Sequence, residues 1–79
     1  MNKYETRVKN CEDFLERELS LEDKLDIAFE TQSTHEFVGL LKQGANPKPL
    51  IASAKIMGGG RLSIAQCDLL KKCTEYLTK

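Results

Sequence analysis

Apolar residues recur along the chain at helical spacing, in short runs separated by turn residues. The first run contains Tyr4, Val8, Cys11 and Leu15, with Phe14 beside them. Its steps of four, three and four residues, together with an N-cap signature at Asn2 and Glu5, predict an amphipathic helix from about residue 3 to 18. No segment alternates between apolar and polar residues as a half-buried strand would, so strands are not expected.

A second helix is predicted after Ser20, which with Asp23 can cap its start. Its apolar positions are Leu21, Leu25, Ala28 and Phe29, and it should end near residue 30 or 31. Neither Gly nor Pro separates it from the first helix, so one helix running through Ser20 is an open alternative.

Ser33 and Glu36 have the spacing of a capping box that opens a third helix, and Gly44 has the character of a left-handed C-terminal stop. Asn46 as N-cap and Pro47 in the first helical position then start a fourth helix, which ends at residues 58–60. The expected buried positions of these two helices are Phe37, Val38, Leu40, Leu41, Leu50, Ile51, Ala54 and Met57.

The last helix should begin at Ser63, where Gln66 completes another capping box and Leu62 can pack against Cys67. Its expected buried seam is Ile64, Cys67, Leu70, Tyr76 and either Cys73 or Leu77. The sequence therefore predicts one all-α domain over residues 1–79, a compact bundle of four or five short helices.

Residues 23–48 resemble one ankyrin repeat. Leu25-Asp26-Ile27-Ala28 and the run from Phe37 to Pro47 follow that family's pattern L-H-x-A…V-x-L-L-x-x-G-A-[ND]-P. The chain lacks the T-P before Leu25, has Asp26 in place of His and contains no second copy. Because about three repeats are needed for a stable stack, an ankyrin array is excluded and the resemblance implies a single helix hairpin.

The segment Gln43-Gly44-Ala45-Asn46-Pro47-Lys48-Pro49-Leu50 is also similar to the Q-G-x-N-P-x-x-L turn of MOZART-type adaptors of the γ-tubulin complex. This match is one short turn, so the adaptors' function is not carried over. Both resemblances are to proteins that bind other proteins.

Charge is unevenly distributed in a chain whose net charge is zero. Residues 1–36 carry ten acidic and five basic side chains, whereas residues 37–79 carry two acidic and seven basic ones. This dipole can steer charged partners, or the two halves can neutralise each other in the fold. No apolar stretch is long enough for a membrane span or a signal peptide, and three cysteines without a C-x-x-C pair favour reduced thiols in a cytoplasmic protein.

No catalytic, metal or cofactor site is predicted. His35, the only histidine, falls in an expected first helical turn at the surface. Cys67 and Cys73 are six residues apart, which places them about 120° apart around a helix, too divergent to bind one metal ion. We therefore expect a protein that is not an enzyme.

Two sets of residues are candidates for binding. Lys48, Lys55, Gly59, Gly60 and Arg61 form an expected basic patch, in which the glycines and the start of the last helix could hold an anion or act as a hinge. Tyr4, Val8, Cys11 and Leu15 form a near-heptad seam that could pair with a second copy or a partner helix.

The expected function is a small helical adaptor or inhibitor that covers a surface on a larger protein, with assembly as a homo-oligomer left open. The alternative is a binder of nucleic acid or a phosphorylated small molecule through the basic C-terminal half. The fourth helix offers no Arg, Asn or Gln to read a base edge, which disfavours sequence-specific DNA binding.

Overall fold

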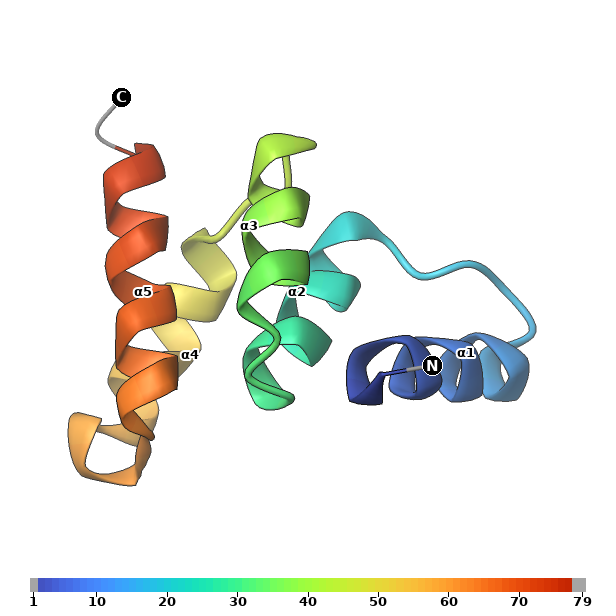
Figure 1. The fold of residues 1–79 in the computed structure, drawn as a ribbon, viewed down its shortest axis with the longest axis horizontal. Coiled ribbons are helices and arrows are strands. Elements are labelled where there is room, and N and C mark those ends of the chain that lie inside the picture. Colours follow the sequence, from blue (N-terminus) through green and yellow to red (C-terminus); the bar gives the residue numbers. More distant parts are fainter. Residues whose placement is uncertain (1, 78–79) are drawn as a thin grey trace.

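The computed structural model describes residues 2–77 and shows an all-α bundle, with no strand among these residues. In chain order its helices are α1 (Lys3–Leu15), α2 (Leu21–Glu30), α3 (Thr34–Lys42), α4 (Lys48–Met57), a short 3₁₀ turn η1 (Gly59–Arg61) and α5 (Ile64–Leu77). In Figure 1, α2 and α3 lie between α1 at one end of the long axis and α5 at the other. The predicted fold class is confirmed.

The core is centred on the hairpin of α2 and α3, against which α5 packs. Phe37 and Leu69 are fully buried, and the rings of Phe29 and Phe37 meet with their centroids 6.3 Å apart. Cys73 and Leu50 bring α5 and α4 into the same cluster. Side chains from α2, α3, α4 and α5 thus share one apolar core, as a domain of this size requires.

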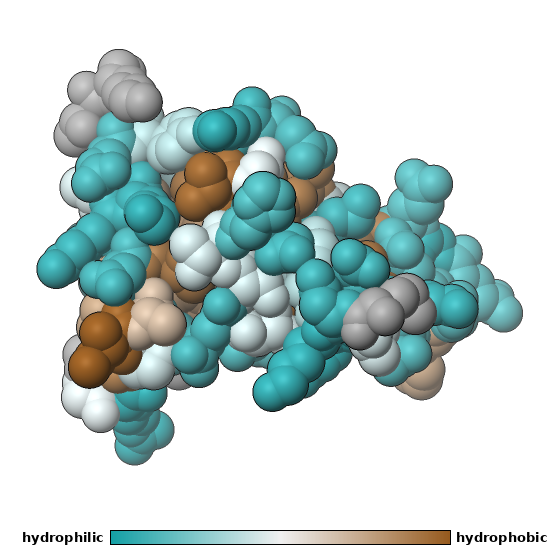
Figure 2. Space-filling model, in the orientation of Figure 1, coloured by the Kyte–Doolittle hydropathy of each residue, from teal (hydrophilic) through white to brown (hydrophobic). Residues whose placement is uncertain are grey.

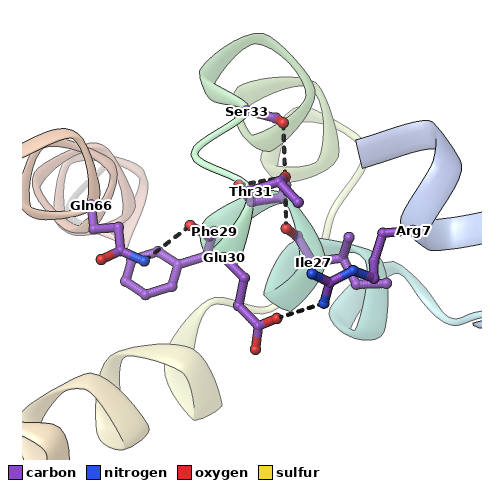
Figure 3. Close-up of polar contacts among 8 residues, drawn as sticks. Arg7, Ile27, Phe29, Glu30, Thr31, Ser33 and Gln66 are labelled. Atoms are coloured by element: carbon purple, nitrogen blue, oxygen red, sulfur yellow. Dashed lines mark hydrogen bonds and ion pairs between the residues drawn. The ribbon is translucent and has the colours of Figure 1, made fainter. Parts of the chain in front are cut away.

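The turn between α2 and α3 corrects one prediction. Ser33 makes no capping bond to its own helix, because its hydroxyl pairs with that of Thr31 at 2.8 Å. The Glu36 carboxylate accepts instead from the side-chain amide of Asn2 at 2.8 Å. Gln32, with φ of 56°, turns the chain, and the Thr31 hydroxyl also donates to the carbonyl of Ile27 (Figure 3). Tertiary partners replace the local capping box here.

The turn between α3 and α4 has part of the predicted chemistry. Gly44 adopts φ of 103°, a value that favours glycine. The Asn46 side-chain oxygen accepts from the amide of Lys48 at 3.1 Å, but α4 begins at Lys48 with Pro47 as its N-cap, one residue later than predicted. The Asn46 amide donates in turn to the Glu22 carboxylate at 3.0 Å, which fixes this turn to the start of α2. The burial of Met57, expected from the sequence, lies outside what the structure describes.

The start of α5 is as predicted, but its buried face is not. Ser63 and Gln66 exchange both capping-box bonds, at 3.0 and 3.1 Å, and the Gln66 side chain also reaches the carbonyl of Phe29 at 3.3 Å. The residues that α5 buries are Leu69 and Cys73, whereas Ile64 is 84% exposed. The expected place of Ile64 in the buried seam is therefore wrong, and Leu69 was missed.

α1 is separate from α2, so the single continuous helix is wrong. It ends at Leu15 and not near residue 18, because Glu16 adopts a left-handed conformation and the chain then runs without helix to Ser20. Ser20 caps α2 by accepting from the amide of Asp23, as predicted. Within residues 2–77, no helix has the length and apolar character needed to cross a membrane.

Candidate interaction surfaces

An open apolar groove lies between α4 and α5. Its volume is about 360 Å³, and its apolar lining includes Ile51 and Ala54 from α4 and Leu70 from α5, with Leu62 from the connection between them. Ile51, Leu62 and Leu70 are only half-buried, although they pack against the core cluster. Cys67, also half-buried, completes the lining. Apolar side chains of the core are thus left accessible along this groove.

The rim of the groove is basic. Lys55, in the last turn of α4, and Lys71 on α5 both line it, together with Thr74, whose hydroxyl donates to the carbonyl of Leu70. No carboxylate belongs to the lining residues. Lys71 also borders a neighbouring polar depression that contains Asp68 and Glu75, whereas Lys55 lies on α4, the other wall of the groove.

The C-terminal end of α1 exposes a second apolar surface. Phe14 is 87% exposed and Leu15 is 45% exposed, although both belong to the apolar run of the first helix. Asp13 and Glu16 flank this pair in the sequence. Arg17, the next residue, is turned to α2, where its guanidinium lies 3.8 Å from the Asp23 carboxylate. We call residues 13–16 the acidic knob.

α1 is held to the bundle by polar contacts at the surface and by half-buried apolar side chains. No residue of α1 is buried, and its ion pair from Arg7 to Glu30, at 3.3 Å, lies at the surface (Figure 3). Tyr4 packs against the core cluster, and partial burial followed by the charges of Glu36 and Glu12 raises the pKa of its phenol. Because exposed ion pairs contribute little, the contact made by Tyr4 is the main apolar attachment of α1.

The predicted seam of α1 is therefore divided. Tyr4, Val8 and Cys11 are half-buried, whereas Leu15 is exposed. The proximal part of the seam faces the bundle and its end faces solvent. Pairing of this seam with another helix stays a prediction.

The residues of the predicted basic patch lie at the two ends of α4. Lys48 is its first residue, Lys55 is in its last turn, and Arg61 ends η1; all three are exposed. In the glycine loop the amide of Arg61 donates to the carbonyl of Gly58, and the amide of Gln66 is taken by its capping bond. This engagement reduces the number of amides available to an anion at Gly59 and Gly60, although anion binding there stays a prediction.

Two isolated isoleucines add to the exposed apolar area. Ile56 on α4 is 87% exposed, and Ile64 lies at the start of α5. Figure 2 shows hydrophobic surface at the lower left, over the lower part of α5. Scattered single apolar residues are normal at protein surfaces, so the groove and the acidic knob, which combine apolar and charged groups, are the stronger candidates.

The histidine and the cysteines were the side chains that the sequence raised as candidates for chemistry. His35 is exposed, and no group of three His, Cys, Asp or Glu side chains among the described residues could hold a metal ion. Cys73 is fully buried, and burial raises the pKa of its thiol to about 11. A thiol of this kind is a packing group and not a nucleophile at neutral pH.

An acidic depression of about 240 Å³ lies on another side of α4, lined in part by Asp26, Glu30 and Gln66. Burial, followed by the charges of Asp23 and Glu30, raises the pKa of the Asp26 carboxyl. A carboxyl with a raised pKa in the folded state retains its proton to higher pH than in the unfolded chain, so its ionised form disfavours folding.

We therefore expect Asp26→Asn to raise the melting temperature at neutral pH. The gain should shrink as the pH is lowered through the titration range of the carboxyl, because Asp26 then becomes neutral in the unsubstituted protein. Thermal unfolding followed by circular dichroism between pH 3 and 8 measures both effects. Asp68→Asn, at a position on α5 that is exposed like Asp26 but does not line this depression, is the matched control, and an equal gain in that variant would contradict the assignment.

No family model matches the chain, and neither a curated protein nor a solved structure matches it.

Proposed function

We propose that this protein is a non-enzymatic helical adaptor or inhibitor that binds a larger protein through the groove between α4 and α5. The observation that carries the proposal is the combination of an accessible apolar lining, from Ile51, Leu62 and Leu70, with a basic rim at Lys55 and Lys71. Interfaces of this kind bury apolar anchors at the centre and place charges at the edge, where they steer association.

The expected partner presents an amphipathic segment with acidic flanks. Apolar side chains of the segment would replace water in the groove, and its carboxylates would lie near Lys55. The odd number of cysteines, none in a C-x-x-C pair, favours a reducing, cytoplasmic setting for this interaction.

Partner identification starts from site-specific crosslinking. A photoreactive residue at Thr74, which lines the groove, should capture the partner from cells of the source organism, whereas the same residue at Lys9, exposed on α1, should not. The captured protein is then produced in pure form and titrated against the chain by calorimetry. Capture that is equal at both positions, or a captured protein that does not bind when pure, counts against the groove.

Charge reversal tests which basic residues bind. We expect Lys55→Glu with Lys71→Glu to weaken partner binding by well over tenfold, because truncating or reversing charges at an interface adds repulsion to lost attraction. Lys48→Glu with Arg61→Glu changes net charge equally but leaves the groove intact, so it should have a much smaller effect. The melting temperature should change little in either variant, since exposed charges contribute about 0 to 1 kcal/mol each.

The outcome of this comparison also separates the alternatives. If the Lys48 and Arg61 pair has the larger effect, the basic patch of the sequence and not the groove is the binding surface. If affinity falls by decades between 50 and 200 mM salt, with a slope of about 0.9 per neutralised phosphate, nucleic acid or a phosphorylated ligand is the partner.

A further inference from the structure

The chain carries on its own surface a segment with the properties expected of the groove's ligand. In the acidic knob the almost fully exposed aromatic residue Phe14 is followed by the exposed Leu15, and the acidic residues Asp13 and Glu16 come directly before and after this pair in the sequence. The groove has the complementary character, an apolar lining with Lys55 and Lys71 at its rim. We propose that the groove receives the acidic knob of a second copy, so that copies of this protein associate head to tail. The inference rests on the proposed role of the groove as an interaction surface.

The contact must be between molecules. α1 and α5 lie at opposite ends of the longest dimension of the molecule, which is 33 Å (Figure 1). The linker from residue 16 to 20 spans at most about 17 Å even when fully extended. The acidic knob is also fixed at the end of the molecule opposite α5. The Leu19 amide donates to the Glu12 carboxylate at 2.9 Å, and the Leu19 side chain is buried. The knob of one copy therefore projects away from its own groove and is presented to another molecule.

Apolar burial supplies the favourable free energy. The groove, with a volume of about 360 Å³, is open to solvent, so an aromatic and an aliphatic side chain that enter it would release water from its apolar lining. Phe14 gives up almost no apolar contact within its own molecule when it enters the groove, because it is already 87% exposed. A single exposed aromatic anchor entering an apolar pocket is the usual composition of a binding hot spot.

Charge sets the orientation of the contact. The N-terminal 36 residues carry a net charge of −5 and the remaining 43 a net charge of +5, so copies in a head-to-tail arrangement bring opposite charges together. Arg17, beside the knob, is already paired with Asp23 and does not oppose Lys55. Because the charges are exposed, association should weaken as salt is added.

A head-to-tail contact joins the acidic knob of one copy to the groove of the next. The resulting dimer still has one free knob and one free groove, to which further copies can bind. The mass of the wild-type protein should therefore increase with concentration beyond that of a dimer, unless a ring closes. Sedimentation velocity from micromolar to millimolar protein measures this. Phe14→Asp should weaken association by at least about tenfold, while the circular dichroism melt stays unchanged because the position is exposed.

Mixing two defective variants gives the decisive test. Phe14→Asp lacks the knob but keeps the groove, whereas Lys55→Glu with Lys71→Glu lacks the groove but keeps the knob. Each variant alone should remain monomeric, and the mixture should form a 1:1 heterodimer that grows no further. The alkylation rate of Cys67, which lines the groove, should fall in the Phe14→Asp partner of that heterodimer, as followed by mass spectrometry.

Three results would overturn the inference. A wild-type protein that stays monomeric at millimolar concentration excludes the contact. A mixture of the two variants that stays monomeric does the same. A groove variant that still dimerises alone assigns self-association to pairing of α1 seams instead. In each case the crosslinking from Thr74 to a foreign partner is judged independently, so the proposed function survives or fails on its own result.

Discussion

Phe37→Ala is expected to remove a large part of the stability of this protein. Phe37 is fully buried at the centre of the α2–α3 hairpin and meets the ring of Phe29. Truncation of a buried phenylalanine to alanine costs about 3 to 5 kcal/mol, through lost apolar contact and the cavity left behind. A 79-residue domain has a total stability of about 4 to 12 kcal/mol, at ~0.05–0.15 kcal/mol per residue. Urea unfolding at 25 °C, followed by circular dichroism, measures the change.

Phe14→Ala is the matched control for this prediction. The same atoms are removed, but from a side chain that is 87% exposed, so the free energy of unfolding should change by less than about 0.5 kcal/mol. Equal losses in the two variants would contradict the arrangement of α1 and α3, because the ring of Phe14 would then have to lie in the core.

The starts of most helices in this chain could be predicted because local chemistry determines them. Asn2, Ser20 and Ser63 each accept from the amide three residues later, and Gly44 provides a positive φ. These bonds involve residues close in sequence and so depend little on the rest of the fold. Ser33 is the exception, since Thr31 and Asn2 compete for the two groups of its capping box. Only the three-dimensional structure brings Asn2 to Glu36.

The buried faces were harder to predict. Along α5 the apolar residues surround the helix, so the sequence permits more than one buried stripe, and packing against α2 and α3 selects the one with Leu69 and Cys73. Along α1 the apolar residues recur with a clear helical period. The bundle covers only part of this apolar face and leaves Phe14 and Leu15 exposed. Periodicity identifies an apolar face without identifying what covers it.

The groove could not be predicted from the sequence, because its walls come from two helices and their connection. Lys55 was a candidate from its spacing to Lys48, but Lys71 gave no signal, since its partner across the groove is sixteen residues away in the chain. The sequence indicated in part that an apolar helix face, such as the end of α1, would stay exposed. Five amphipathic helices in 79 residues exceed what one small core can bury, although the sequence does not say which helix is left uncovered.

Alkaline pH is expected to destabilise this protein through Cys73. Burial raises the pKa of its thiol from 9.0 to about 11, so the folded state keeps the proton where the unfolded chain loses it. The stability that depends on the neutral thiol is fully present below pH 9 and is lost as the pH rises from about 9 to 11. Two pH units correspond to about 2 to 3 kcal/mol, at ~1.36 kcal/mol per unit. Urea unfolding at pH 8, 9, 10 and 11 in the presence of reductant measures the loss.

Cys73→Ala isolates the contribution of the thiol from that of other groups that titrate in the same range. Tyr4 also has a raised pKa, and its ionisation should destabilise the wild-type protein and the variant to the same extent. At pH 8 the variant should be the less stable of the two, because a small cavity replaces the sulfur atom. That difference should decrease by about 2 to 3 kcal/mol by pH 11 and can change sign, since only the wild-type protein must then keep a buried thiol neutral against the solvent. A difference that stays constant from pH 8 to 11 would place Cys73 in contact with water, in conflict with its full burial between α5 and the α2–α3 hairpin.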